Sequence, residues 1–461
     1  MPDTSDVPEP TVGSVIGINE AVSIPNKVIG SLDAAERATE WATDISAVRG
    51  MGVEHVRIHT AHYPFLSWHG QRAGDTGAAD EVIVEILEAG LQPLVMIGPW
   101  PGNETANHTD RYLPDDLPAY AAWVTETVER YDGDGVDDAP GLIGKVRVWE
   151  IDNEPDLHHF VAPRQEGSRP VFRSPGGFEP PEEYAEVAVW TARAIHAADP
   201  SAVVLLAGMW EAQTPRGQEY LRTVLSDPDV LTSVDAINVH RYPKSGVEAV
   251  WDAMGRAGAA APGKPVWITE VSTPSKGQST ERSQAEDLIN LVLGALRRGV
   301  PRVYWHALIE GPTYYQRDTM ATVGRHLLVG APGTAQRWHG IERWPEPHRK
   351  LAAWSLREFL VRFGGTPRHD VRTVQASPGA EALHIGNEVL VYWAGKRPEN
   401  AAVKLPFSGP VSVHALVPAQ DRGIDVVGSP TWPTWRAQTD DVGNLTVNLS
   451  RGPVRVAPDG R

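Results

Sequence analysis

The sequence of 461 residues contains no cysteine. This absence excludes disulfide bonds, thiol nucleophiles and cysteine-ligated metals, and it says nothing about the redox compartment. The sequence also lacks any apolar run near the roughly 18 residues that a membrane helix needs. Residues 1–12 have neither the basic region nor the apolar segment of a signal peptide. We therefore expect no membrane partner, and either a cytoplasmic protein or a secreted one whose signal has been removed.

Basic residues are fewer than acidic ones. The chain has 42 lysines and arginines against 59 aspartates and glutamates, a net charge of -17 at pH 7. An acidic surface of this kind argues against nucleic acid or an anionic membrane as the main partner. The sequence gives no indication of an oligomeric state.

Tryptophan, by contrast, is frequent: the chain has 16, against 7 phenylalanines and 11 tyrosines. An indole ring stacks on the apolar face of a sugar and donates one hydrogen bond. Tryptophans near the ends of expected strands, among them Trp100 and Trp305, are therefore candidate sugar-binding residues. About half of all the tryptophans are expected to fill the core instead.

Strand and helix patterns alternate from residue 12 to about residue 362. Expected strands cover residues 12–18, 53–59, 92–97, the stretch that begins at 145, 203–207, 235–240, 265–270 and 302–308. Expected helices cover residues 33–49, 79–89, 116–131, 181–198, 219–225, 247–257, 283–298 and 348–363. Eight such units with nearly continuous apolar strands predict an α/β fold, a TIM (β/α)8 barrel. A doubly wound open sheet is the alternative, but no G-x-G-x-x-G turn follows the first strand.

After Gly364-Gly365 the apolar residues alternate with a period of two. Short strands are expected at residues 371–375, 382–384, 388–393, 402–405, 411–416, 424–427, 445–449 and 454–456. This pattern predicts a C-terminal all-β sandwich, so the expected domains are 1–363 and 364–461. Because no exposed aromatic row is evident beyond Trp432 and Trp435, we expect this domain to brace the barrel rather than to bind a glycan.

Residues 145–156, KVRVWEIDNEPD, predict a strand that ends at an Asn-Glu-Pro turn. Because side chains alternate along a strand, Glu150, Asp152 and Glu154 should share one face. Glu270 ends the seventh expected strand as Glu154 ends the fourth. A parallel barrel builds its active site at the C-terminal ends of its strands, so the two glutamates should face each other across the barrel mouth.

Two facing carboxyl groups are what a retaining glycosidase needs, one to protonate the leaving oxygen and one to attack the anomeric carbon. Their separation should then be roughly 5–5.5 Å, whereas an inverting enzyme needs roughly 6.5–9.5 Å to admit water. Crowded charge and partial burial should keep Glu154 protonated while Glu270 stays ionised.

Several further side chains at strand ends suit such a site. Arg57 and Tyr242 are candidate donors to Glu270, and His59 shares the face of Arg57. His240 is expected to bind a sugar hydroxyl or to position the acid.

Two more candidates would contact the sugar directly. Asn153 can donate to the hydroxyl next to the anomeric carbon. Trp305 is a candidate floor for the sugar ring.

Structural interpretations of these residues stay open. Arg57 can be a structural ion pair, and Glu150 and Asp152 can pair with Arg147 or another neighbour inside the barrel. Glu310 is a competing acid. The histidines could ligate a metal, but no H-x-H or H-E-x-x-H spacing occurs, so we expect no metal and no cofactor.

The chemistry-bearing segments resemble a known family. Trp149-Glu150-Ile151 before Asn153-Glu154-Pro155-Asp156, with Arg57-x-His59 upstream and His240-x-Tyr242 and Glu270 downstream, resembles clan A glycoside hydrolases. The sequence is most similar to family 39, which includes β-xylosidases and α-L-iduronidases and has a β-sandwich after its barrel. The resemblance implies Glu154 as acid/base, Glu270 as nucleophile and net retention. Asp152 stands where the family often has tryptophan, so we expect it to affect sugar binding.

The sequence therefore predicts a retaining glycoside hydrolase with a carbohydrate substrate. We expect exo action on a xylose- or arabinose-type glycoside. The alternatives are an endo-acting polysaccharide hydrolase of the same clan and a non-catalytic carbohydrate-binding barrel. Long connections at residues 60–78, 99–115, 157–180 and 309–346 can form the walls of either a pocket or a cleft.

Overall fold

The computed structural model describes residues 9–19, 44–58, 65–69, 72–73, 76–99, 113–156, 180–210, 212–275, 280–310, 342–343 and 348–459. Eight parallel strands of this part of the chain form a barrel: β1 (Ile16–Asn19), β2 (His55–Ile58), β5 (Gln92–Pro99), β6 (Val148–Ile151), β7 (Val203–Met209), β8 (Ala236–Arg241), β9 (Val266–Val271) and β10 (Val303–His306). The barrel is closed because β1 pairs with β10 and β2 pairs with β5. The predicted TIM barrel is confirmed, and the open sheet is excluded.

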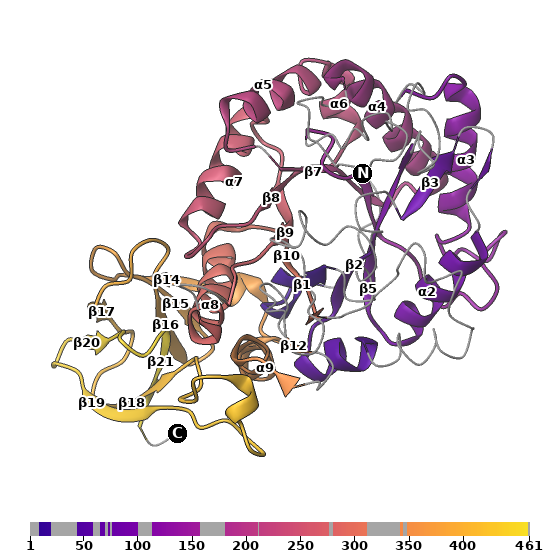
Figure 1. Cartoon of the computed structure of the whole chain (residues 1–461). Helices are drawn as coiled ribbons and strands as arrows, with labels where there is room; N and C mark the ends of the chain where they lie inside the picture. Colours follow the sequence, from indigo (N-terminus) through magenta and orange to yellow (C-terminus); the bar gives the residue numbers. More distant parts are fainter. Residues whose placement is uncertain are drawn as a thin grey trace, which may run out of the picture.

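Helices surround the strands (Figure 1). They are α2 (Thr76–Glu88), α3 (Leu117–Glu129), α4 (Pro181–Ala198), α5 (Pro215–Val224), α6 (Pro228–Ser233), α7 (Glu248–Ala260), α8 (Glu281–Arg298) and α9 (Leu351–Phe363). Residues 44–51, the described part of the first expected helix, are helical. Helix α4 has the predicted bounds, whereas α6 was not predicted. The Asp227 side chain caps α6 by accepting from the backbone N–H of Asp229 at 2.9 Å, and Pro228 starts the helix. No helix within the described residues is both long and apolar enough to cross a membrane.

Alternation along the strands separates two apolar layers. Inside the barrel, a small cluster comprises Leu94, Val148, Leu205, Ala236, Trp267 and Tyr304. The outward residues of the barrel strands, such as Ile18, Val56 and Trp149, join the larger core beneath the helices. Polar side chains follow the inner cluster toward the C-terminal ends of the strands, so the apolar plug forms a floor below the candidate site.

Short strands lie within two of the long connections. A hairpin of β3 (Leu66–His69) and β4 (Arg72–Ala73) extends the barrel sheet beside β5. A second small sheet comprises β11 (Ile309–Glu310), β12 (Glu342–Arg343) and β13 (His348–Arg349).

The C-terminal domain is the predicted all-β sandwich. One sheet contains β14 (Arg372–Val374), β15 (Glu381–Ile385), β16 (Glu388–Tyr392), β21 (Val454–Pro458), β18 (Pro410–Ala415) and β19 (Thr434–Gln438), and a two-stranded sheet pairs β17 (Asn400–Lys404) with β20 (Asn444–Asn448). The strand expected at residues 424–427 is wrong: Gly423–Asp425 form a 3₁₀ turn, and Val427 is 92% exposed. Strand β19 was not predicted, because only Trp435 and Ala437 mark its apolar face.

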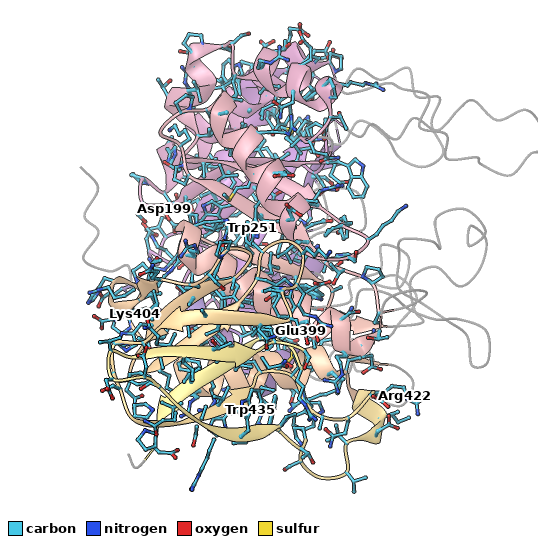
Figure 2. The ribbon with its side chains drawn as sticks, turned by 90° about the vertical axis from the view of Figure 1, so that its left-hand side faces the viewer. Asp199, Trp251, Glu399, Lys404, Arg422 and Trp435 are labelled. Atoms are coloured by element: carbon cyan, nitrogen blue, oxygen red, sulfur yellow. The ribbon has the colours of Figure 1, made fainter. Side chains whose placement is uncertain are left out.

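The sandwich packs on α8 and α9 (Figures 1 and 2). The Tyr392 hydroxyl donates to the Leu293 carbonyl at 3.1 Å, and Arg298 pairs with Glu381 at 3.0 Å. The buried Glu388 accepts from Arg455 of its own domain at 3.0 Å and from Arg362 of α9. These contacts favour the bracing role expected for this domain.

Candidate active site

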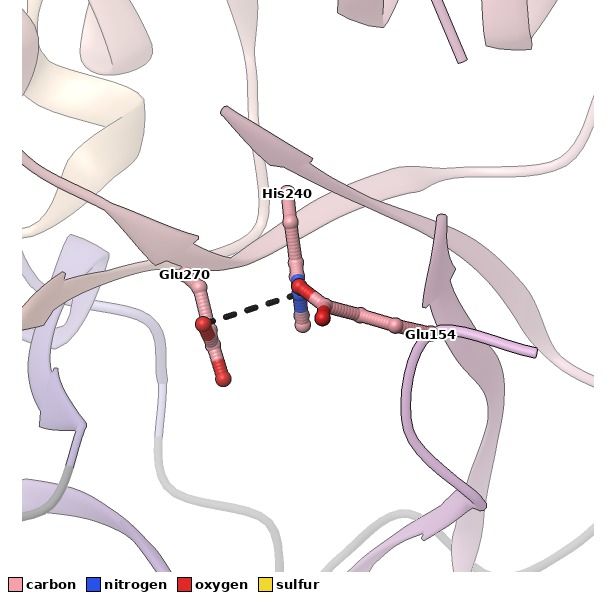
Figure 3. A group of neighbouring side chains, drawn as sticks. All are labelled: Glu154, His240 and Glu270. Carbon is pink, nitrogen blue, oxygen red and sulfur yellow. Dashed lines mark hydrogen bonds and ion pairs between the residues drawn. The ribbon is translucent and has the colours of Figure 1, made fainter. Parts of the chain in front are cut away.

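Two glutamates meet at the C-terminal ends of β6 and β9. Glu154 and Glu270 are 8% and 5% exposed, and they approach from opposite sides of the His240 ring (Figure 3). One carboxylate oxygen of each and one ring nitrogen of His240 all lie within 4.8 Å of one another. The expected pairing of the two glutamates is therefore present, and both carboxyl groups lie near Nδ1 of His240.

The backbone after β6 turns sharply. The strand ends at Ile151, and Asp152 and Glu154 have φ angles of 68° and 49°, in the left-handed region that L-residues seldom adopt. Such a conformation costs on the order of 1–3 kcal/mol per residue and is concentrated at functional sites. The expectation that Glu150, Asp152 and Glu154 share one strand face is wrong, because regular alternation stops at Ile151. The turn, not the pleat, directs Glu154 at His240.

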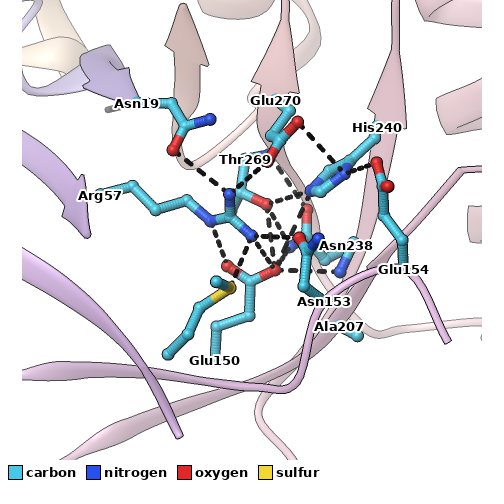
Figure 4. Close-up of polar contacts among 12 residues, drawn as sticks. Asn19, Arg57, Glu150, Asn153, Glu154, Ala207, Asn238, His240, Thr269 and Glu270 are labelled. Atoms are coloured by element: carbon cyan, nitrogen blue, oxygen red, sulfur yellow. Dashed lines mark hydrogen bonds and ion pairs between the residues drawn. The ribbon is translucent and has the colours of Figure 1, made fainter. Parts of the chain in front are cut away.

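Arg57 of β2 lies at the centre of the polar contacts in the site (Figure 4). It is 1% exposed, and it donates to Glu150 from Nε at 2.6 Å and from Nη2 at 2.9 Å. Its Nη1 donates to Glu270 at 2.6 Å and its Nη2 to Asn153 at 3.0 Å. Burial alone would lower the pKa of Arg57, but the charges of Glu150 and Glu270 raise it above its usual value. The two interpretations of Arg57 thus combine, because it forms a structural ion pair and also contacts Glu270.

Glu150 is fully buried beneath the pair. Besides Arg57, it accepts from the Gly208 backbone N–H and the Asn238 side chain, each at 2.9 Å. Burial raises the pKa of Glu150, and the charge of Arg57 opposes that rise. The partner of Glu150 is therefore Arg57 of β2, which β5 separates from β6, and not Arg147.

Tyr242 supports Glu270 from the other side. Its hydroxyl donates to Oε2 of Glu270, the contact expected from the sequence. Its ring lies 5.3 Å from that of Trp210 and 5.6 Å from that of His306, centroid to centroid. Glu270 thus receives a hydrogen bond on each oxygen, which favours its carboxylate form.

His240 is hydrogen-bonded to Glu154. Its Nδ1 lies 2.6 Å from Oε1 of Glu154, and its Nε2 lies 2.9 Å from Oγ1 of Thr269. The ring is fully buried, and burial is the main reason that its pKa falls to about 3. His240 is therefore neutral near pH 7, and its bond to Glu154 is a hydrogen bond rather than an ion pair.

The environment of Glu154 favours a protonated carboxyl group. Burial is the largest influence that raises its pKa well above the usual value, and the charges of Glu270 and Asp156 add to it. This is the direction expected from the sequence. Both glutamates are buried, but their partners differ: Glu154 contacts a neutral imidazole, whereas Glu270 accepts from a guanidinium and a phenol.

The expectation that Trp305 forms the floor of the sugar site is wrong. Trp305 is fully buried in the core between the barrel and the helices, because it alternates with inward-facing Tyr304 and His306. His306 occupies the inward position at the tip of β10, with its Nδ1 2.9 Å from Nδ2 of Asn19. His59 and Trp100 lie outside the described residues.

Asp152 is 4% exposed, and it accepts from the backbone N–H of Asn153 at 2.7 Å. Its charge contributes to the raised pKa of Tyr120 and of Tyr184, after burial as the main cause. Both tyrosines belong to the helix layer, on α3 and α4. The surroundings of Asp152 therefore include the helix layer. The effect of Asp152 on sugar binding stays a prediction.

Sequence reasoning missed Asn19, Asn238, Thr269 and His306. Three of them follow from alternation, because Asn19 and His306 occupy inward positions at strand tips and Asn238 an inward position within β8. Thr269 was missed because the prediction placed Glu270 on the inward face, although Thr269 follows the inward-facing Trp267 by two residues. The pairing of β8 with β9 shifts register between Val239 and His240, and this irregularity lets both Thr269 and Glu270 contact interior groups.

Gly208 of β7 must be a glycine for His240 to occupy its place. A Cβ at Gly208 would overlap the imidazole, with Cε1 only 2.6 Å away. We expect Gly208→Ala to displace His240 from Glu154 and to lower kcat/KM about 10²-fold, the usual cost of a shift of about 1 Å in a catalytic group. Gly255→Ala on α7, where a Cβ meets nothing within 4 Å, is the control. Steady-state kinetics of both folded variants decide, and equal activity would contradict the packing argument.

Two groups of the described residues have the spacing of metal ligands. They are Glu154, His240 and Glu270 at the barrel mouth, and Glu129, Asp132 and Asp134 in the acidic turn after α3. In the first group, Arg57 already neutralises Glu270, and this positive charge disfavours a cation. The absence of a catalytic metal stays a prediction.

Comparisons with known proteins agree with this geometry. Residues 183–325, which include His240, Tyr242 and Glu270, match the family model described as glycosyl hydrolase catalytic core. A search of curated proteins found no match.

Similar solved structures include a family 39 glycoside hydrolase from the gut symbiont Bacteroides cellulosilyticus WH2, at 14% identity and a TM-score of 0.59, covering 98% of this chain and 82% of that one. A family 39 β-xylosidase from Caulobacter crescentus has 19% identity and a TM-score of 0.56, covering 96% and 95%. An α-L-arabinofuranosidase from Thermotoga maritima has 12% identity and a TM-score of 0.58, covering 98% and 97%. This chain therefore shares its fold with these glycoside hydrolases, and its residues 183–325 match a glycosyl hydrolase catalytic core.

Proposed function

We propose that the protein hydrolyses O-glycosidic bonds with retention, by double displacement, with Glu154 as acid/base and Glu270 as nucleophile. The observation that carries this proposal is the pair itself. Its nearest oxygens lie within 4.8 Å, on the short side of the roughly 5–5.5 Å that retaining enzymes have and well below the roughly 6.5–9.5 Å of inverting ones.

In the first step, an oxygen of Glu270 attacks the anomeric carbon while Glu154 gives its proton to the departing glycosidic oxygen. The C–O bond to the leaving group breaks, and a covalent glycosyl-enzyme forms. The raised pKa of Glu154 suits the acid, because its proton is retained near neutral pH. Arg57 and Tyr242 hold Glu270 in the orientation for attack.

In the second step, Glu154, now a carboxylate, takes a proton from water, and the hydroxide attacks the anomeric carbon. Glu270 leaves as a carboxylate, and the two inversions give net retention. Asn153 accepts from Arg57 through Oδ1, so its amide NH₂ is the group presented as a donor. We assign this donor to the sugar hydroxyl next to the anomeric carbon, where a hydrogen bond strengthens in the transition state.

For the substrate, we propose an exo-cleaved xylose- or arabinose-type glycoside. The support is the fold shared with a β-xylosidase and an α-L-arabinofuranosidase. An endo-acting polysaccharide hydrolase is the alternative, and the connections that would distinguish them lie mostly outside the described residues. A non-catalytic barrel is disfavoured, because Glu154 and Glu270 are both present with their supporting donors.

The decisive variant for the acid is Glu154→Gln, assayed with aryl xylosides, arabinosides, galactosides, glucosides and uronides. On the preferred glycoside, kcat/KM should fall about 10²–10⁴-fold when the leaving phenol is poor, and far less when it is a dinitrophenol, which needs no proton. In the unmodified protein, kcat/KM should decline as the pH rises through the pKa of Glu154, since only the acid form donates. That alkaline decline should disappear in Glu154→Gln.

The matched control is Glu219→Gln on α5, whose side chain is 69% exposed. It should leave the kinetics unchanged. Equal losses of Glu154→Gln on good and poor leaving groups would assign a different role to Glu154.

A further inference from the structure

A buried chain of hydrogen bonds joins Glu150 to the acid (Figure 4). Oε1 of Glu150 lies 3.2 Å from Oγ1 of Thr269. The same hydroxyl lies 2.9 Å from Nε2 of His240, whose Nδ1 lies 2.6 Å from Glu154. Glu150, Thr269 and His240 are fully buried, so the direction of each hydrogen bond follows from the groups present.

The orientation of the Asn238 amide can be assigned, and it fixes the direction of the neighbouring hydrogen bonds. The backbone N–H of Thr269 can only donate, and it donates to Oδ1 of Asn238 at 3.1 Å. This contact assigns the orientation of the Asn238 amide, which geometry otherwise leaves ambiguous. Its NH₂ group therefore donates to Thr269 Oγ1 at 2.6 Å and to Glu150 at 2.9 Å.

As a carboxylate, Glu150 can only accept hydrogen bonds, and its partners indicate that it is a carboxylate. Its partners include four N–H groups, namely Nε and Nη2 of Arg57, the Gly208 backbone N–H and the Asn238 amide. A carboxyl group so surrounded is ionised, with the guanidinium as its counter-charge. Its contact with the Thr269 hydroxyl is attractive only if that hydroxyl donates, because otherwise two oxygens would face each other without a proton.

The Thr269 hydroxyl then has no proton left for His240. Its single proton is directed at Glu150, and its two lone pairs accept from Asn238 and from Nε2 of His240. Nε2 therefore carries the imidazole proton. Because the ring is neutral, Nδ1 is a bare acceptor, and the 2.6 Å contact requires Glu154 to donate.

We propose that Thr269, oriented by Glu150, fixes the tautomer of His240 and thereby keeps the catalytic proton on Glu154; this inference rests on the proposed function of Glu154. Thr269 is a positioning residue, since it acts through the imidazole. After proton transfer to the leaving group, the Glu154 carboxylate would face a bare nitrogen. That repulsion favours the uptake of a proton from water in the second step.

The other charged groups near His240 leave this assignment unchanged. Oε2 of Glu270 lies 3.7 Å from Nδ1, too far for a hydrogen bond, and Oε1 of Glu150 lies 4.0 Å from Nε2. The charge of Glu270 favours a protonated ring, whereas Arg57 and His306 oppose it. Burial is the largest of these influences, so the ring is neutral beside the protonated Glu154.

The test compares Thr269→Val, which removes the hydroxyl, with Thr269→Ser, which keeps it. In Thr269→Val, His240 is free to carry its proton on Nδ1 and to donate to the Glu154 carboxylate, which lowers the pKa of the acid. The alkaline limb of kcat/KM should then move down by about one pH unit, the equivalent of one hydrogen bond. Thr269→Ser should retain the original limb. A drop in rate without this shift would indicate a merely structural role and overturn the proposal.

A second measurement does not depend on activity. ¹⁵N NMR of histidine-labelled protein reports which ring nitrogen carries the proton, with His240 assigned by the loss of its signals in His240→Asn. A proton on Nε2 in the unmodified protein supports the proposal, even if Thr269→Val fails to fold. A proton on Nδ1 refutes it while leaving the proposed function intact. The proposed function fails separately, if Glu154→Gln does not affect poor leaving groups.

Discussion

Glu270→Gly should lower kcat/KM by about 10⁴-fold or more, because within the described residues no other carboxylate is placed to attack the anomeric carbon. The variant should still fold. Arg57 keeps its bidentate partner Glu150, at 2.6 and 2.9 Å, so no buried charge loses its counter-charge. Steady-state kinetics on the preferred aryl glycoside measure the loss, and circular dichroism checks the fold.

Azide should restore turnover to Glu270→Gly, since the small anion fits the volume that the carboxylate leaves beside Arg57. It would attack from the face that Glu270 used and displace the aryl leaving group once, so the glycosyl azide should have inverted configuration. Glu270→Gln keeps the volume filled and should not be rescued, which makes it the matched control. A rescued product of retained configuration, or equal rescue of both variants, would contradict the nucleophile role.

Loss of Glu270 should also leave the protein at least as stable. Three carboxyl groups, those of Glu150, Glu154 and Glu270, surround the single guanidinium of Arg57 in this buried cluster. Removing one of these carboxyl groups reduces a charge repulsion that contributes to catalysis and not to the stability of the fold. After burial, which is the main cause, the charge of Glu270 also raises the pKa of Glu154, so the crowding of carboxyl groups helps to keep the acid protonated.

The barrel was predictable because its strands are buried apolar runs and its helices show a regular apolar face. The tips of those runs gave Glu154 and Glu270 directly. Arg57, Tyr242 and His240 followed, because parallel strands place their C-terminal ends at one mouth. The contacts of Glu270 with Arg57 and Tyr242 are those expected from the sequence, whereas the contact of Glu154 with His240 depends on the turn after β6.

What could not be predicted depends on local backbone geometry. Trp305 was assigned to the sugar site because its place near a strand end was visible, but its inward or outward direction was not. Thr269 and Glu270 are consecutive, and both contact the site because of a register shift between β8 and β9, which no apolar period reveals. The positive φ of Asp152 likewise ended an alternation that the sequence alone appeared to continue.

Arg57→Met should destabilise the protein by about 3–5 kcal/mol, because it leaves the buried Glu150 and Glu270 without a counter-charge. It should also lower kcat/KM by on the order of 10³-fold, since Glu270 loses a charged donor at 2.6 Å. Urea unfolding and steady-state kinetics measure the two effects. Arg193→Met is the control, because its pair with Asp229 is more than half exposed and should contribute less than about 1 kcal/mol.

The double variant Arg57→Met/Glu150→Gln separates the two roles of the arginine. Glu150→Gln removes one of the two unpaired charges, so part of the lost free energy of unfolding should return. Activity should stay low, because Glu270 still lacks its donor and the glutamine no longer holds the Thr269 hydroxyl as a carboxylate does. If activity recovers with stability, Arg57 acts only as the counter-charge of Glu150. If stability alone recovers, the same guanidinium both supports the barrel interior and orients the nucleophile, which is why a buried arginine occupies this strand.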